Sequence, residues 1–455
     1  MFNFSRIAKS AAVAATLLPV ALFAEDTAAA INSGDTAWVL IATALVMLMT
    51  PGLAFFYAGM TRSKHSVSTL FQNFAALGVV GILWAICGYS LAFGLSGNGF
   101  IGNLQWFMLN GVNAAPNADY AATIPHSAFM IYQCMFAVIT PILMTGAIAE
   151  RVKFKSLLAF VALWSLCVYV PVAHWVWGVG GFIRNLGALD FAGGMVVHMT
   201  AGFSALILAI LIKNRNDFGK TETRPHDVGW VMLGTGLLWF GWFGFNAGSA
   251  LGANGLASHA LCSTFFASAA AFLTWMSMDW IRKGKPSAVG AGIGAVAGLV
   301  TITPGSGFVT FGAAMLYGVL AGSLCNLAVG LIKDKFKLDD TLDVAACHGV
   351  GGLLGTILTA VFATKTVNPA GADGLFYGDF ALMKAHIIAS IAVILFSCII
   401  TFVLYKIVDG IFGMRVSENE ERQGLDTTQH GEVVNSLTET SHGTANPPSN
   451  LKMAR

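Results

Sequence analysis

Two histidines, His198 and His348, stand in apolar stretches long enough to cross a membrane, and each follows an aspartate (Asp190 and Asp340) by eight residues. An ionisable side chain at bilayer depth is costly unless it faces a partner or a cavity, so it indicates a functional site. Because the spacing occurs twice, we interpret it as one site built from two related halves. Imidazoles both donate and accept hydrogen bonds, which favours a channel or transporter for a small polar solute.

The composition is that of a protein embedded in lipid. Of the 455 residues, 56% are hydrophobic and 11% are charged, whereas soluble domains carry about 25% charged residues. The composition therefore predicts an all-α integral membrane protein in the lipid bilayer. No basic patch with interleaved aromatic residues occurs, so we expect no nucleic-acid partner. The seven cysteines show no metal-binding spacing, and we expect neither a metal nor a cofactor.

A membrane-spanning helix needs about 20 mostly apolar residues. Lysine and arginine concentrate in alternate loops, which by the positive-inside rule places the N-terminus outside and the C-terminus in the cytoplasm. We therefore expect a multi-pass protein of the inner (cytoplasmic) membrane. Eleven spans are predicted, of which the eighth is short and rich in glycine: 37–58, 67–94, 126–149, 156–177, 191–212, 228–248, 258–281, 287–303, 308–332, 341–363 and 381–407.

The ends of the chain differ from this middle part. Residues 1–24 resemble a signal peptide, with cleavage after residue 24 or 30. The transporter domain then covers residues 35–412. The tail, 413–455, is polar and charged, which predicts a cytoplasmic segment whose end is disordered.

The two histidines fall in the fifth and tenth predicted spans. Five is an odd number, so a second unit of five inserts upside down, as in transporters built from inverted repeats. We predict pseudo-repeats over about 37–212 and 228–363, followed by the helix 381–407. If each aspartate begins its helix, each histidine lies about 12 Å from its own membrane face. A core of about 30 Å then leaves about 6 Å between the rings, so we expect them to meet and line a pore.

The alternative is a pair of core histidines that only joins helices. For Asp190 and Asp340 we expect a structural role, because an aspartate at a helix start caps backbone N–H groups and suits the positive end of the dipole. Attraction of the substrate by Asp190 is the other interpretation.

Four motifs resemble the ammonium transporter family (Amt/Mep/Rh), in its bacterial Amt form. They are Asp-Phe-Ala-Gly-Gly-x-Val-Val-His (190–198), Gly-Trp-Phe-Gly-Phe-Asn-Ala-Gly-Ser (241–249), Ala-Glu-Arg (149–151) and His-Gly-Val-x-Gly (348–352). The resemblance runs from about Asp35 to Glu432. It implies a homotrimer with one pore in each protomer, which transports NH₄⁺/NH₃ for nitrogen uptake and is not an enzyme.

The same resemblance implies roles for several side chains. The outer ammonium site corresponds to Phe136, Trp164 and Ser249, with Tyr132 where some relatives have phenylalanine. The gate beneath it corresponds to Phe136 and Phe245. Ring faces can hold a small cation, whereas an unpaired ion in an apolar pore is very costly. We therefore expect NH₄⁺ to be recruited and deprotonated, NH₃ to pass the histidines, and the proton to cross separately.

The tail carries a further resemblance to the regulatory segment of this family. Its residues are Glu421, Arg422, Gly424, Leu425, Asp426 and, beyond them, His430-Gly-Glu432. The resemblance implies a cytoplasmic PII-type signal protein as partner. Three other functions stay open: a PII-coupled ammonium sensor, an Rh-like channel for a neutral gas, and an intramembrane enzyme. No HExxH motif or third metal ligand accompanies the histidines, which disfavours the enzyme.

Overall fold

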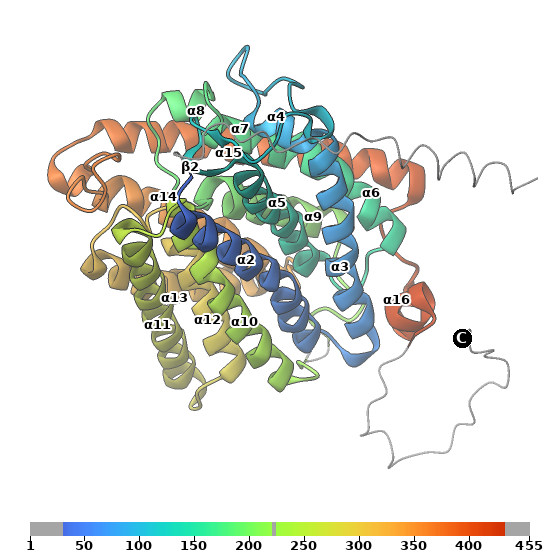
Figure 1. Ribbon diagram of the computed structural model, residues 1–455. Helices are drawn as coiled ribbons and strands as arrows, with labels where there is room; N and C mark the ends of the chain where they lie inside the picture. Colours follow the sequence, from blue (N-terminus) through green and yellow to red (C-terminus); the bar gives the residue numbers. More distant parts are fainter. Residues whose placement is uncertain (1–30, 221–223, 433–455) are drawn as a thin grey trace, which may run out of the picture.

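The computed structural model describes residues 31–220 and 224–432 as a helical bundle with one short β-hairpin (Figure 1). The predicted signal peptide and the predicted disordered end of the tail, 433–455, lie outside the described residues. Ten helical segments of the described chain are long and apolar enough to cross a membrane: Ser33–Met60, Ser63–Phe93, His126–Ile148, Phe154–Asn185, Gly194–Ile212, Val228–Ala250, Gly255–Lys283, Phe311–Lys335, Ala345–Phe362 and Ala381–Phe412. The protein is therefore a multi-pass membrane protein.

Many of these segments join an α-helix to a 3₁₀ or π-helical turn. The elements of the first half, up to residue 212, are α2 (Ser33–Met60), η1 (Ser63–His65), α3 (Ser66–Leu83), η2 (Trp84–Gly88), α4 (Tyr89–Phe93), η3 (Phe107–Leu109), β1 (Pro116–Asn117), β2 (Ala121–Pro125), α5 (His126–Leu143), η4 (Met144–Ile148), α6 (Phe154–Trp164), η5 (Ser165–Tyr169), α7 (Val170–Trp177), α8 (Phe182–Asn185), η6 (Gly194–Met199) and α9 (Thr200–Ile212). The strands β1 and β2 pair antiparallel.

The rest of the chain adds a second set of helices and the tail. Its elements are α10 (Val228–Ala247), η7 (Gly248–Ala250), α11 (Gly255–Lys283), α12 (Ala288–Ile302), α13 (Phe311–Gly330), η8 (Leu331–Lys335), η9 (Ala345–Val350), α14 (Gly351–Phe362), η10 (Leu375–Tyr377), α15 (Ala381–Phe412), α16 (Glu418–Gln423) and η11 (Asp426–His430). In Figure 1, α2 of the first set lies beside α10 of the second, and the two pack along each other.

The predicted span 287–303 is the helix α12, which has only 15 residues and is not among the ten long segments. Every residue from 290 to 302 is buried, because α12 packs against α10, α11, α13 and α14. Glycines permit this close packing: a Cβ on Gly298 would lie 2.6 Å from the Cβ of Ala271. Pro304 follows the helix end, where its missing N–H and fixed ring oppose further helix.

The bundle has two ends, named here by their capping aspartates. The Asp190 end holds the start of α2, the hairpin and the loop after α10, where the Asp35 carboxylate accepts a hydrogen bond from the Ala253 N–H at 2.8 Å. The Asp340 end holds the loops 61–65, 149–153, 213–217 and 337–343 together with the tail. Between the ends, large apolar side chains face outward, such as Leu273 in the middle of α11 and Leu395 in the middle of α15, which suits a lipid environment.

The two segments that carry the histidines cross in backbone contact. A Cβ on Gly202 of α9 would lie 1.9 Å from the backbone nitrogen of Gly349, and one on Gly352 would lie 2.9 Å from the Cβ of His198. Only glycine allows helices to approach so closely. These glycines therefore fix the distance between the two histidine-bearing segments.

Candidate functional site

His198 and His348 are in direct contact at the centre of the bundle. Their Nδ1 atoms lie 3.2 Å apart and their ring centroids 5.3 Å apart. Both are buried. One neutral ring can donate this hydrogen bond while the other accepts it. The contact agrees with the separation estimated from the sequence, although both residues lie in π-helical turns, η6 and η9, rather than in the regular α-helix assumed there. Such turns occur frequently at functional sites.

Each histidine-bearing turn is capped by its aspartate. The Asp190 carboxylate accepts four hydrogen bonds from the backbone N–H groups of residues 193–196, at 2.6–3.2 Å. The Asp340 carboxylate accepts two from residues 344–345, at 2.7 and 3.1 Å. Backbone N–H groups at a helix start have no partner within the helix, and a carboxylate there satisfies them. This geometry is the structural role expected for both aspartates.

The histidine pair faces a narrow cavity, which we call the histidine cavity and which has room for about one water-sized molecule. The His198 ring lies nearly parallel to Trp242 and Phe245, at 23° to each and at centroid distances of 5.4 and 6.0 Å. Its Nε2 atom has no hydrogen-bond partner among the described residues. A cavity with apolar walls and imidazole nitrogens can hydrogen-bond a neutral solute but solvates an ion poorly. The other lining residues are Met49, Leu53, Ile139, Leu143, Val197, Leu238, Val296 and His348.

Phe136 and Phe245 separate this cavity from a second one. Their ring centroids are 4.3 Å apart, with planes at 35°, and both side chains are buried. Phe136 lines the second cavity, whereas Phe245 lines the histidine cavity. The two predicted gate residues thus lie together, as a closed contact between the cavities.

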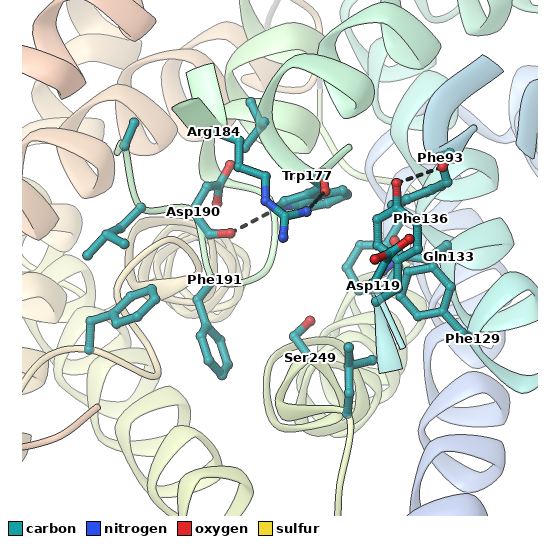
Figure 2. A pocket seen from close by; sticks show the side chains of 16 residues that line it. Phe93, Asp119, Phe129, Gln133, Phe136, Trp177, Arg184, Asp190, Phe191 and Ser249 are labelled. Atoms are coloured by element: carbon teal, nitrogen blue, oxygen red, sulfur yellow. Dashed lines mark hydrogen bonds between the residues drawn. The ribbon is translucent and has the colours of Figure 1, made fainter. Parts of the chain in front are cut away.

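The second cavity, which we call the aromatic pocket, lies at the Asp190 end and opens to solvent (Figure 2). Phe136, Trp177 and Ser249 line it, and the rings of Phe136 and Trp177 meet edge to face at 5.9 Å. The Ser249 hydroxyl donates to the carbonyl of Phe245 at 2.9 Å. The pocket therefore combines ring faces with a hydroxyl oxygen, a set suited to a small cation with N–H groups.

Tyr132 lies next to the aromatic pocket and contacts one of its lining residues, Ser249. Its side chain is fully buried, and its hydroxyl lies 2.9 Å from the carbonyl oxygens of Gly244 and Phe245 and 3.2 Å from the Ser249 hydroxyl. It does not line the pocket. Its hydroxyl holds the end of α10 and thereby Ser249 in place, a contact that phenylalanine at this position would lack.

The structure does not bring Trp164 into the aromatic pocket. Trp164, the last residue of α6, is buried against α9 and α15, where its indole N–H lies 3.1 Å from the Ser204 hydroxyl and 3.0 Å from the Thr401 hydroxyl. The tryptophan of the pocket is Trp177, which donates to the backbone carbonyl of Asp190 at 3.0 Å (Figure 2). This corrects the assignment made from the sequence. A signal was available, because the predicted span 156–177 has Trp177 at its outer end and Trp164 in its interior.

A network of ion pairs at the Asp340 end was not predicted from the sequence. Glu150 pairs with Arg62 and with Arg215, and Arg215 also pairs with Asp339 at 2.8 Å. Burial disfavours the charged form of Glu150, but its positive neighbours outweigh burial and lower its pKa to about 2. The guanidinium of Arg151 donates to the Asp339 carbonyl at 2.6 Å. The network therefore ties together the loops beside Asp340, the cap of the His348 segment.

The tail folds back onto this end of the bundle. The Asp426 carboxylate accepts from the N–H groups of residues 67–68 at 3.1 and 2.8 Å, which caps α3. The Glu421 carboxylate accepts from the Asn216 N–H and pairs with Arg415, both at 2.8 Å. The N–H of Leu425 lies 3.2 Å from His65 Nδ1. Lys64 donates to the Arg422 carbonyl, and the chain turns at Gly424, which has a φ of 109°. Through these contacts the tail residues singled out from the sequence lie in one segment docked on the bundle.

Comparison with known proteins places the chain in one family. A model of the Ammonium Transporter Family matches residues 37–435. An ammonium transporter of Bacillus subtilis is 49% identical over 88% of this chain and 98% of its own length. The ammonium transporter Amt1 of Archaeoglobus fulgidus is 44% identical, over 89% and 99%. The crystal structure of Candida albicans Mep2 is 37% identical, with a TM-score of 0.82 over 87% of this chain and 89% of that one. The solved structure of a "Sensor Amt Protein" is 29% identical, with a TM-score of 0.80 over 87% and 98%. The chain thus belongs to the ammonium transporter family.

Proposed function

We propose that this protein takes up ammonium as a source of nitrogen, by recruiting NH₄⁺ and conducting NH₃ while the proton crosses separately. The observation that carries the proposal is the histidine pair in an apolar cavity, closed off from the aromatic pocket by the contact of Phe136 and Phe245. An ion has no solvation in such a cavity, whereas ammonia needs only one or two hydrogen bonds there.

The recruitment step uses the aromatic pocket. The rings of Phe136 and Trp177 attract the cation, at about 0.5–2 kcal/mol for each contact, and the Ser249 oxygen accepts one N–H. Deprotonation beside the closed rings lets NH₃ enter the histidine cavity. Potassium has no proton to lose, so the same apolar cavity excludes it.

The histidine pair supplies a path for the released proton. A hydrogen bond between the two Nδ1 atoms lets a proton move from one imidazole to the other. Net transport is then electrogenic. Without this step the protein is a neutral ammonia channel, in the Rh-like manner, and carries no current.

A PII-coupled ammonium sensor is the second candidate. Its support is the similarity to the "Sensor Amt Protein" together with the docked tail, which joins the loops at the Asp340 end. In this alternative, occupancy of the pore changes the tail, and flux through the pore is small.

We further propose the membrane arrangement. Counting α12 gives eleven helices, in two inverted units of five with the histidines in the fifth and tenth, and the protomers form a homotrimer. The Asp340 end faces the cytoplasm of the inner membrane, because the loops there carry lysine and arginine. The aspartate caps before both histidine segments support the two-fold repetition.

Currents on a solid-supported membrane test the transport mechanism. Liposomes with the purified protein receive ammonium and then potassium pulses. We expect a current with ammonium only, and we expect His198→Ala and His348→Ala to abolish it or to make the protein permeable to potassium. His259→Ala is the matched control, because His259 of α11 lines neither cavity. Substantial ammonium uptake without current would refute the electrogenic mechanism and leave neutral conduction.

Truncation tests the tail and its PII-type partner, for which the docked segment supplies a surface beside the loops at the Asp340 end. Removal of all residues after Met414 deletes the contacts of Glu421 and Asp426, and we expect altered transport or altered inhibition by a PII-type protein. Truncation after Glu432 keeps the docked segment and serves as the control. If the shorter protein keeps both the transport rate and the PII response, the regulatory role of the tail is wrong.

A further inference from the structure

The aromatic pocket contains a side-chain amide, that of Gln133 (Figure 2). Gln133 lies on α5, four residues after Phe129 and three before Phe136, and all three side chains line the pocket. This spacing places them on one helical face. The face continues with Ile139 and Leu143, which line the histidine cavity. The amide therefore lies along the path from the aromatic pocket to the histidines, just before the phenylalanine contact.

The oxygen of this amide has no partner. Gln133 Oε1 is buried, and it is the one buried side-chain atom without a hydrogen bond among the described residues that line the pocket. Most other buried polar groups there are engaged: the Asp190 carboxylate accepts four N–H groups, Ser249 donates to Phe245, and Trp177 donates to the Asp190 carbonyl. The charged side chains of Asp119 and Arg184 also line the pocket but are exposed, and Arg184 donates to the Trp177 carbonyl. A buried acceptor without a donor costs free energy, which points to a ligand that supplies the donor.

We propose that Gln133 Oε1 is a binding group for the recruited ammonium ion and accepts one of its N–H bonds. This inference rests on the proposed function. Ammonium has four N–H groups, and the faces of Phe136 and Trp177 attract its charge without accepting a directed hydrogen bond as an oxygen does. Ser249 supplies one acceptor oxygen and Gln133 supplies a second. The buried part of the site then consists of two neutral oxygens and the ring faces, with the charged side chains of Asp119 and Arg184 in its exposed part.

The neutrality of the amide suits a site that must release a proton. A carboxylate at position 133 would hold NH₄⁺ as an ion pair and favour the charged form over NH₃. An amide oxygen accepts the same hydrogen bond but carries no negative charge, so it opposes the deprotonation of NH₄⁺ less than a carboxylate would. Gln133 therefore combines recruitment with release, and the two substitutions to leucine and to glutamate separate these contributions.

The test compares ammonium currents and ammonium binding in three variants. Gln133→Leu should raise the half-saturating ammonium concentration about tenfold, which corresponds to about 1.4 kcal/mol of binding. Gln133→Glu should lower the half-saturating concentration and also lower the maximal current. Asn73→Leu is the matched control, because Asn73 of α3 also has a buried amide oxygen without partner but lines neither cavity. We expect its half-saturating concentration to stay that of the parent protein.

A second measurement does not depend on conduction. Ammonium chloride should raise the thermal midpoint of the purified parent protein more than potassium chloride does, and Gln133→Leu should reduce this difference while Asn73→Leu preserves it. If the parent protein conducts ammonium and Gln133→Leu neither raises the half-saturating concentration nor reduces the thermal shift, the inference is overturned and the proposed function stands. A parent protein with no ammonium current and no ammonium uptake overturns the proposed function itself. If Gln133→Leu fails to fold, an unchanged half-saturating concentration in Gln133→Glu overturns the inference.

Discussion

Replacement of Trp177 by leucine should weaken the capture of ammonium. The indole lies in the aromatic pocket, edge to face with Phe136 at 5.9 Å, and its N–H holds the Asp190 carbonyl at 3.0 Å. A cation–π contact contributes about 0.5–2 kcal/mol, so its loss raises the half-saturating ammonium concentration about 2- to 30-fold. The assay is the dependence of the current on ammonium concentration, on a solid-supported membrane.

Two further variants separate the ring from its hydrogen bond and from general damage. Trp177→Phe keeps a ring but loses the N–H donor, so its half-saturating concentration should lie between those of the parent protein and Trp177→Leu. Trp164→Leu removes a tryptophan that lies outside the pocket and bonds to Ser204 and Thr401. Trp164→Leu should lower the thermal midpoint, because it leaves a cavity and removes two hydrogen bonds. The folded fraction of this variant should keep the half-saturating ammonium concentration of the parent protein. A rise in half-saturating concentration for Trp164→Leu with none for Trp177→Leu would refute this reasoning.

Two predictions concern the elements that hold the site. Gly202→Ala places a Cβ 1.9 Å from the Gly349 nitrogen and should force the histidine segments apart, with loss of current and a lower thermal midpoint. Gly81→Ala is the control: its Cβ would have no atom within 4 Å, so current and thermal midpoint should stay unchanged. Normal transport by Gly202→Ala would contradict the close packing. Glu150→Gln leaves Arg215 partly unpaired and should destabilise the protein by about 3–5 kcal/mol. Because the folded pKa of Glu150 is about 2 and its reference value is 4.5, its stabilisation is complete above about pH 4.5 and is lost as pH falls towards 2. Thermal midpoints that show the same pH dependence in both proteins would count against this role.

The length and order of the apolar stretches could be read from the chain, because membrane spans depend on local composition. Ten of the eleven predicted spans are long helices in the structure, with starts and ends that differ from the prediction by a few residues in most cases. The eighth is shorter, because Pro304 and its buried glycines make it an interior helix. The repeated spacing of Asp190–His198 and Asp340–His348 also predicted that the rings meet. Both rest on local pattern and on the fixed geometry of a helix in a bilayer.

Which tryptophan and which polar side chains line the aromatic pocket was decided only by the tertiary structure. Trp164 and Trp177 lie on the same apolar stretch, and the rotation and depth of that helix among its neighbours place one in the pocket and the other between α9 and α15. That Gln133 Oε1 is buried without a hydrogen-bond donor can be recognised only from the packed structure, where its neighbours are known. Glu150, Arg215 and Asp339 come from loops far apart in sequence, so their network exists only once the helices have packed. Residue type and spacing thus determined the family and the spans, whereas burial, facing and hydrogen-bond partners are properties of the packed bundle.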